Sequence, residues 1–315
     1  MPTLPLTLFP RRAGAVRSID DASALGLPVL GSISEYKTGS GAPLPDEAFP
    51  EALKAFHRLA DVVRAADFRV RGNAIVVTSV DAGAGKSTIA QNLATLLARS
   101  GSKVVLVDAD VNRVVRRRPG DGTSSSGFAG LLVNQLMRPS NALVHTMDIR
   151  LKLLPAGSTN GPADALLLSS RLARVVDGLC GLADYVIFDV APVSAGLPNL
   201  TRLSDVTLVV LRSGATSRKQ ASRAVATLRP ANAGLLGFVL NRAAVVISAR
   251  GSETEAPEAE IALPAPEERL EISVDDLLAN LAGTLRLIRD IRRAGEAEDG
   301  AEDDEEDSEL VTMER

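Results

Sequence analysis

The sequence predicts a doubly wound α/β fold with a mostly parallel sheet, and three observations lead to this expectation. Short apolar runs rich in β-branched residues alternate with helical stretches across residues 74–240. A glycine-rich loop joins the first run to a helix, and acidic residues end two later runs. Runs with almost no polar residues are typical of strands buried on both faces, which occur in parallel sheets covered by helices. Alternation of such strands with helices gives a doubly wound sheet.

The expected elements follow from this pattern. The strands are Ala74–Thr78, Val104–Val107, Leu151–Leu154, Val186–Phe188, Val206–Leu211 and Leu235–Leu240. The helices are Pro50–Ala66, Ser87–Ser100, Ala163–Leu182 and Ser217–Leu228. In the first helix the apolar residues recur at helical spacing, which gives it one face to bury against the sheet.

Composition divides the chain into a central domain and flanking segments. We expect a flexible N-terminal segment at 1–48, the domain at 49–243, a linker at 244–272, a helix at 273–293 and a disordered tail at 294–315. The N-terminal segment is rich in Pro, Gly and Ser but contains an apolar island, Leu25–Ile33. The tail carries eleven acids and one Arg, a net charge of −10, so the other residues sum to +6 in a chain of net charge −4. Such a run indicates either a solubility tail or a charged interaction segment.

The composition also excludes several classes of site and location. The single cysteine, Cys180, has apolar neighbours, so we expect a core residue in a reducing cytoplasm and no cysteine-based zinc site. His57 and His145 stand apart in the sequence and suggest neither a metal site nor a catalytic triad. No run approaches the roughly 20 apolar residues of a membrane-spanning helix. The chain is therefore expected to be cytoplasmic, and peripheral attachment to the membrane through a partner stays open.

The strongest chemical signal is a phosphate-binding loop between the first strand and its helix. Its residues are Gly83, Ala84, Gly85, Lys86, Ser87 and Thr88. Backbone N–H groups of such a loop hold phosphate oxygens, and glycines let the main chain approach them. Lys86 is expected to reach the β- and γ-phosphates of ATP, and Ser87 to place its hydroxyl on Mg²⁺. The strict eight-residue pattern needs glycine where this chain has Val80.

Acidic residues end two further predicted strands. Asp108 and Asp110 follow the second strand, and Asp189 follows the fourth. The carboxyl ends of strands in an open α/β sheet face the crevice where ligands bind. Asp108 or Asp110 is expected to accept a proton from an attacking hydroxyl, and Asp110 and Asp189 to bind Mg²⁺ directly or through water. For the first pair, a simple helix N-cap is the competing interpretation.

Asn241 ends the last predicted strand and is a candidate for binding the base of the nucleotide. It is not followed by the Lys-x-Asp that recognition of guanine would use, which favours adenine. An asparagine that only stabilises a turn is an equally good interpretation.

Together these features resemble the bacterial tyrosine kinases of capsule and exopolysaccharide synthesis, which share a P-loop core with chromosome-partitioning ATPases. The resemblance covers Leu25–Ala243. It is carried by Thr78–Leu93, similar to the family's Walker A motif, Val107–Arg113, similar to its Walker A′ motif, the pair Leu153–Gly157 and Pro162–Leu167, and the island Leu25–Ile33. Partitioning ATPases usually have a lysine at the place of Asp81, which favours the kinase branch.

The resemblance implies a kinase that is activated by a separate membrane co-polymerase. The chain nevertheless departs from the family pattern at several motifs. Its Walker A′ arginine is displaced to Arg113, and the Walker B motif reads Asp189-Val-Ala-Pro192. The oligomerising motif of the first helix is altered in Glu51–His57, which leaves a homo-oligomer as an open alternative. The C-terminal tyrosine cluster is missing, and the tail has acids in its place. We hypothesise that this fixed charge imitates a phosphorylated tail; unchanged activity and assembly after deletion of 294–315 would count against it.

Three functions therefore compete. The first is an Mg·ATP-dependent phosphotransferase that regulates polysaccharide assembly, with Tyr36 as a candidate acceptor and Tyr185 as a structural residue. The second is a nucleotide-switched regulator of a co-polymerase that phosphorylates no tyrosine. The third is a partitioning or positioning ATPase, for which the cluster Arg113, Arg116, Arg117 and Arg118 leaves an acidic partner open. A solvated loop is the simpler interpretation of that cluster, so nucleic acid is not the expected partner.

Overall fold

The computed structural model describes residues 14–36, 49–66, 73–110, 127–157, 166–194, 196–230 and 234–243. The predictions for the linker 244–272, the helix 273–293, the tail 294–315 and the arginine cluster at 113–118 concern residues outside these ranges. Among the described helices, none combines the length and apolar character that crossing a bilayer would require.

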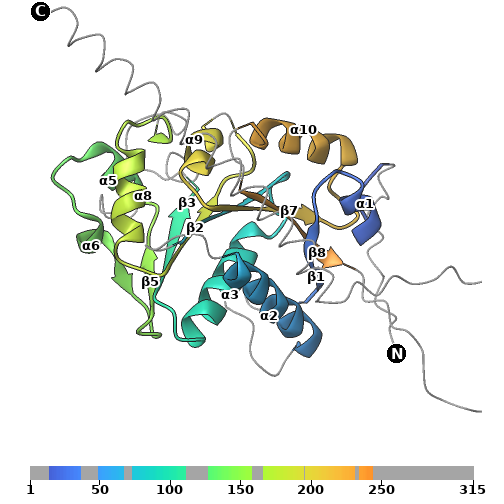
Figure 1. The fold of residues 1–315 in the computed structure, drawn as a ribbon, viewed down its shortest axis with the longest axis horizontal. Coiled ribbons are helices and arrows are strands. Elements are labelled where there is room, and N and C mark those ends of the chain that lie inside the picture. Colours follow the sequence, from blue (N-terminus) through green and yellow to red (C-terminus); the bar gives the residue numbers. More distant parts are fainter. Residues whose placement is uncertain are drawn as a thin grey trace, which may run out of the picture.

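A single eight-stranded sheet organises the described chain, in the order β1-β8-β7-β2-β6-β3-β5-β4 (Figure 1). Every neighbouring pair is parallel except β4 and β5. The strands are β1 Val29–Ser34, β2 Asn73–Ser79, β3 Val104–Ala109, β4 Val144–His145, β5 Leu151–Leu154, β6 Tyr185–Val190, β7 Val206–Arg212 and β8 Leu235–Ala243. This confirms the doubly wound, mostly parallel sheet, and each of the six expected runs forms a strand.

Helices cover both faces of the sheet and divide the core into two layers (Figure 1). On one face, α2 Pro50–Ala65 and α3 Lys86–Arg99 pack on alternate residues of the strands, such as Ile75 and Val77 of β2. The opposite face takes α5 Phe128–Val133, α8 Leu172–Cys180, α9 Leu197–Arg202 and α10 Arg218–Leu228. Because β2 is buried along its whole length, its two faces serve both layers. Cys180 is buried in the second layer, as expected for a core residue.

The structure extends the sheet into the segment that was expected to be flexible. The island Leu25–Ile33 contributes β1, which pairs in parallel with β8 at one edge of the sheet. Before it, α1 Ile19–Ser23 begins at a capping box in which Ser18 and Asp21 satisfy each other's backbone N–H groups. Leu30 and Ile33 are buried against α2. Residues 14–36 therefore belong to the domain, because the apolar island has a sheet edge to cover.

The helix expected at Ala163–Leu182 is shorter in the structure, where α8 begins at Leu172. The hydroxyl of Ser169 donates to the carbonyl of Leu132 and accepts from the N–H of Arg171, which holds the chain in a turn. A serine that bonds to nearby backbone competes with helix formation in this way. Besides β1, the described elements that were not expected are short: α1, α5, α6 Pro139–Ala142, α9 and β4. Short elements depend on tertiary packing more than on their own sequence.

Candidate functional site

The glycine-rich loop lies between β2 and α3, at the carboxyl edge of the sheet. Gly83 and Gly85 have φ angles of +73° and +96°, a region that residues with a side chain rarely adopt. The hydroxyl of Ser79 donates to the carbonyl of Asp81 at 2.8 Å and so fixes the start of the loop. At its end, the carbonyl of Gly85 accepts the N–H of Ile89 at 3.0 Å, so Gly85 is the N-cap of α3. The N-terminus of a 14-residue helix thus opens at the end of the loop, which favours an anion there.

Asn241 supports this loop from the end of β8. Its amide nitrogen donates to the carbonyl of Ala84 at 2.8 Å, and its amide oxygen accepts the N–H of Arg242 at 2.9 Å. A Cβ atom built on Gly85 would lie 2.0 Å from the amide nitrogen of Asn241. Glycine is therefore required at position 85 both by its φ angle and by the close approach of Asn241. The expected contact of Asn241 with adenine stays a prediction, and the structure gives this side chain a supporting role that the sequence did not reveal.

The expected charged residues come together around Lys86. Its ammonium group lies 3.3 Å from a carboxylate oxygen of Asp110 and 3.5 Å from one of Asp189. All three residues are less than 10% exposed. A buried ammonium group needs such partners, because burial of an unpaired charge is strongly unfavourable. The loop, the end of β3 and the end of β6 therefore meet at one small, charged site.

Asp108 and Asp189 lie side by side in the sheet. They are direct neighbours in the register of β3 and β6, and a carboxylate oxygen of Asp108 accepts the N–H of Asp110 at 3.3 Å. Burial raises the pKa of Asp189, and the charge of Asp108 acts in the same direction. The ammonium group of Lys86 and a hydrogen bond with Ser87 act against this shift. The site therefore holds more negative charge than its buried lysine balances, which suits an added cation.

The residues proposed for Mg²⁺ fit such an ion only in part by themselves. Ser87 hydrogen bonds with Asp189, and Asp110 lies 3.3 Å from the ammonium group of Lys86. Within the described ranges, no three His, Cys, Asp or Glu side chains gather into a protein-only metal cage. Mg²⁺ is usually bound by one or two carboxylates together with phosphate oxygens and water. The donor set of Ser87, Asp110 and Asp189 agrees with a site of that kind. Thr88 lies on the first turn of α3, where its carbonyl accepts from the Asn92 amide.

Comparison with known proteins identifies the family. The model of the CobQ/CobB/MinD/ParA nucleotide binding domain matches residues 75–263, more than half of the chain. The chain belongs to this nucleotide-binding family. The tyrosine-protein kinase YwqD of Bacillus subtilis is 31% identical over 170 residues, which cover 53% of this chain and 71% of the relative. The chain is thus a member of the tyrosine-kinase group within the family.

Two solved structures of this group share the fold. The BceF tyrosine kinase domain is 28% identical, with a TM-score of 0.59, and the match covers 72% of this chain and 98% of that domain. The chimerical protein CapA2B2 is also 28% identical, with a TM-score of 0.59 and coverage of 70% and 97%. The sheet, the loop and the carboxylates described above thus belong to a nucleotide-binding domain of the tyrosine-kinase group.

The structure also contains contacts beside the phosphate-binding loop that were not predicted from the sequence. The hydroxyl of Thr78, at the end of β2, donates to the carbonyl of Ala191 at 2.9 Å. The N–H of Val193 donates to the carbonyl of Ser79 at 3.0 Å. Both bonds tie the loop after Asp189 to the start of the phosphate-binding loop. Thr78 carries a signal that sequence reasoning could have used, because a threonine at the buried end of a parallel strand needs a partner.

The hydroxyl of Tyr36 and the residue Tyr185 are both buried in this chain. The ring of Tyr36 contacts the rings of Phe49 and Phe56, with centroids 5.5 and 6.3 Å apart. Its hydroxyl is buried without a hydrogen-bond partner in the part of the chain that the structure describes, and burial raises the pKa of Tyr36 to about 12. Tyr185 is 7% exposed in β6, which confirms its structural role. Neither hydroxyl is presented as a phosphate acceptor.

Proposed function

We propose that this chain binds Mg·ATP and acts as a phosphotransferase of the tyrosine-kinase group. In this proposal, its activity regulates capsule or exopolysaccharide assembly. The observation that carries the proposal is the burial of Lys86 between Asp110 and Asp189 beside a loop with two left-handed glycines. An ammonium group, carboxylates and a helix N-terminus in one place are the parts that phosphoryl transfer requires.

Each residue of the site has a proposed role. Lys86 exchanges its carboxylate partners for the β- and γ-phosphates, while the backbone of Gly83, Ala84 and Gly85 lines the phosphate chain. Ser87, Asp110 and Asp189 would hold Mg²⁺, which neutralises charge on the phosphates when it is bound. Asp108 or Asp110 orients the acceptor hydroxyl and accepts its proton. Burial raises the pKa of Asp189, so a cation beside its carboxylate would favour the ionised form.

The choice of acceptor distinguishes this proposal from a second candidate. A nucleotide-switched regulator, which binds and hydrolyses ATP without phosphorylating tyrosine, is favoured by the burial of the Tyr36 hydroxyl and of Tyr185. If the chain is a kinase, its acceptor then lies on another protein. A partitioning ATPase is disfavoured by Asp81 at the place of the usual lysine. Asp81 has one carboxylate oxygen buried without a hydrogen-bond partner within the described residues.

Intact-mass measurement with Mg·ATP tests these alternatives, with released phosphate assayed in the same tubes and Lys86→Ala as the control. We expect phosphate release that depends on Lys86 and no adduct on either tyrosine. Addition of a membrane co-polymerase of polysaccharide synthesis, the proposed partner at the cytoplasmic face of the membrane, is expected to reveal phosphate transfer to that partner. Transfer that needs Lys86 would establish the kinase, whereas release without transfer would establish the switch. The absence of ATP binding would contradict both.

A further inference from the structure

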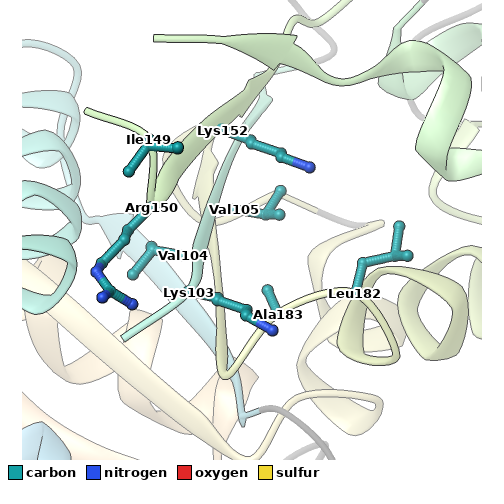
Figure 2. Close-up of a pocket in the computed structure, with 8 residues that line it drawn as sticks. All are labelled: Lys103, Val104, Val105, Ile149, Arg150, Lys152, Leu182 and Ala183. Carbon is teal, nitrogen blue, oxygen red and sulfur yellow. The ribbon is translucent and has the colours of Figure 1, made fainter. Parts of the chain in front are cut away.

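A basic pocket lies at the edge of the sheet opposite the phosphate-binding loop. It has a volume of about 320 Å³ and is formed where β3 and β5 begin, beside the turn after α8 (Figure 2). Its lining contains three cations and no acid: Lys103, Val104, Val105, Ile149, Arg150, Lys152, Leu182 and Ala183. None of these residues takes part in the nucleotide site. The pocket therefore needs an explanation of its own.

Strand register places two lysines on the same side of the pocket. Lys152 pairs with Val105 across β5 and β3, and Lys103 precedes Val105 by two residues, so the three side chains share a face. Figure 2 shows them pointing to the same side of β3, toward Leu182 and Ala183. The floor between the two ammonium groups is thus apolar, and Leu182 at its rim is 43% exposed.

The neighbouring acids do not neutralise these lysines. Asp184 accepts a hydrogen bond from the backbone N–H of Lys103 at 2.7 Å, and Asp148 accepts one from the backbone N–H of Arg150 at 2.9 Å. The guanidinium group of Arg150 donates to the carbonyl of Gly101. Within the described residues, neither the Lys103 nor the Lys152 side chain forms an ion pair with an acid. Two ammonium groups beside exposed apolar surface suit a ligand that joins carboxylates to an apolar anchor.

The chain itself contains a segment of this chemistry. Residues 302–309 contain seven acids, and Leu310, Val311 and Met313 follow at once. We propose that the segment Glu302–Met313 docks in this pocket, with its carboxylates beside Lys103 and Lys152 and an apolar side chain against Leu182. The pocket then fixes the acidic end of the chain at the edge of the sheet opposite the nucleotide site.

The length of the chain permits this contact. β8 ends at Ala243, at the carboxyl edge of the sheet, and four strand positions separate β8 from β3. With strands about 4.8 Å apart and about 20 Å long, the pocket lies on the order of 30 Å from Ala243. The segment 244–301 contains 58 residues, which is long enough to bridge this distance. Even at the helical rise of about 1.5 Å per residue they would span about 87 Å.

Carbodiimide cross-linking of the full chain, followed by peptide mass spectrometry, tests the proposal because it joins only ammonium and carboxylate groups in direct contact. We expect carboxylates of 302–309 to join Lys103 and Lys152 at least about fivefold more often than the exposed Lys219. At about 1 M salt, where the screening length falls to about 3 Å, this preference should disappear. Equal yields at Lys219 and the pocket lysines, or no link from 302–309 to Lys103 or Lys152, would overturn the proposal.

A variant tests the apolar part of the contact without removing any cross-linking group. Leu182→Glu places a like charge beside the docked acids and removes the anchor, so the yield at Lys103 and Lys152 should fall about tenfold. Leu168→Glu is the matched control, because Leu168 is 62% exposed and lies outside the pocket. Equal yields in the two variants would contradict docking at this site. The measurement needs no nucleotide, so its outcome is independent of the proposed function.

Discussion

Lys86 holds together the two carboxylates that it contacts in the site. Two buried carboxylates share its ammonium group, so removal of the lysine leaves uncompensated negative charge at the ends of β3 and β6. We therefore expect Lys86→Met to lower the free energy of unfolding by about 3 kcal/mol, as for a broken buried ion pair. Urea unfolding of the nucleotide-free protein measures this difference. Lys219→Met, an exposed residue on α10, should change it by less than about 0.5 kcal/mol, and a similar value for Lys86→Met would contradict the role of the trio.

Tyr36 offers a test of a buried hydroxyl that has no hydrogen-bond partner among the described residues. Tyr36→Phe removes that group and keeps the aromatic contacts, so we expect stability near pH 7 to be unchanged or raised by up to about 1 kcal/mol. The pKa of Tyr36 is raised to about 12 by burial, above its ordinary value of 10.0. The native state therefore keeps a proton that the unfolded chain loses, and stability falls as pH rises from 10 toward 12. The variant should lack this part of the fall in pH-dependent unfolding, and identical curves would exclude a buried hydroxyl.

At the scale of the loop, Gly85 and Asn241 should behave as one unit. Gly85→Ala combines an unfavourable φ angle with a 2.0 Å clash against the Asn241 amide. Gly214→Ala is the matched control, because Gly214 has a φ of +72° and no atom within 4 Å of an added Cβ. We expect the control to lose about 1–2 kcal/mol, the strain of a left-handed residue, and Gly85→Ala to lose clearly more.

The double variant Gly85→Ala/Asn241→Ala separates the two effects. Removal of the amide relieves the clash. The summed losses of unfolding free energy in the two single variants should therefore exceed the loss in the double variant by at least about 1 kcal/mol. Binding of a fluorescent nucleotide provides a second measurement. We expect binding to be lost in Gly85→Ala and partly restored in the double variant. Strict additivity in the unfolding experiment would show that Asn241 does not contact the loop in solution.

At the scale of the elements, β1 should contribute to stability as a core strand does. Ile33 is fully buried between β8 and α2, so Ile33→Ala should destabilise the protein by about 2–5 kcal/mol. Ile149 is 87% exposed, and Ile149→Ala should change stability by less than about 0.5 kcal/mol. Urea unfolding of the two variants measures both changes in stability. A negligible loss at Ile33 would mean that the N-terminal segment is not part of the folded domain.

Most of the predicted strands could be recognised in the sequence because they are buried on both faces. Val206–Leu211 contains one polar residue, Thr207, and nothing in such a run depends on a distant partner for recognition. β1 was harder to recognise, since its Gly31 and Ser32 break the apolar run and its place at the sheet edge is set by β8. The length of α8 depended on a bond between Ser169 and Leu132, 37 residues apart. No local pattern contains that information.

The candidate site divides in the same way. The loop, Lys86 and the acids at strand ends were expected, because spacing within one motif or one strand places them. The role of Asn241 was not, since its partner Ala84 is 157 residues away. The ring contacts of Tyr36 depend on Phe49, the N-cap of α2, and on Phe56 within α2. Side chains that act through such tertiary contacts need the fold before they can be assigned.

At the scale of the whole molecule, removal of the first strand should change the association state. In a chain that lacks residues 1–35, β8 becomes an edge strand without its partner β1. Apolar surface of α2 that β1 covers is then exposed. Unpaired strand edges promote association with other chains. We expect this variant to elute as aggregates in size-exclusion chromatography, whereas a chain that lacks residues 1–13 should elute like the parent. Identical profiles for the parent and the longer truncation would contradict the pairing of β1 with β8.

The pairing of β1 with β8 also has a consequence for synthesis on the ribosome. The two strands are separated by about 200 residues of sequence, so this edge of the sheet has a high contact order and forms late. At roughly 5–20 residues per second, β1 waits at least about ten seconds for β8 to be translated. During that time its apolar residues are available to chaperones. Completion of the domain is therefore tied to translation through Ala243, and the phosphate-binding loop cannot gain its support from Asn241 of β8 on a shorter nascent chain.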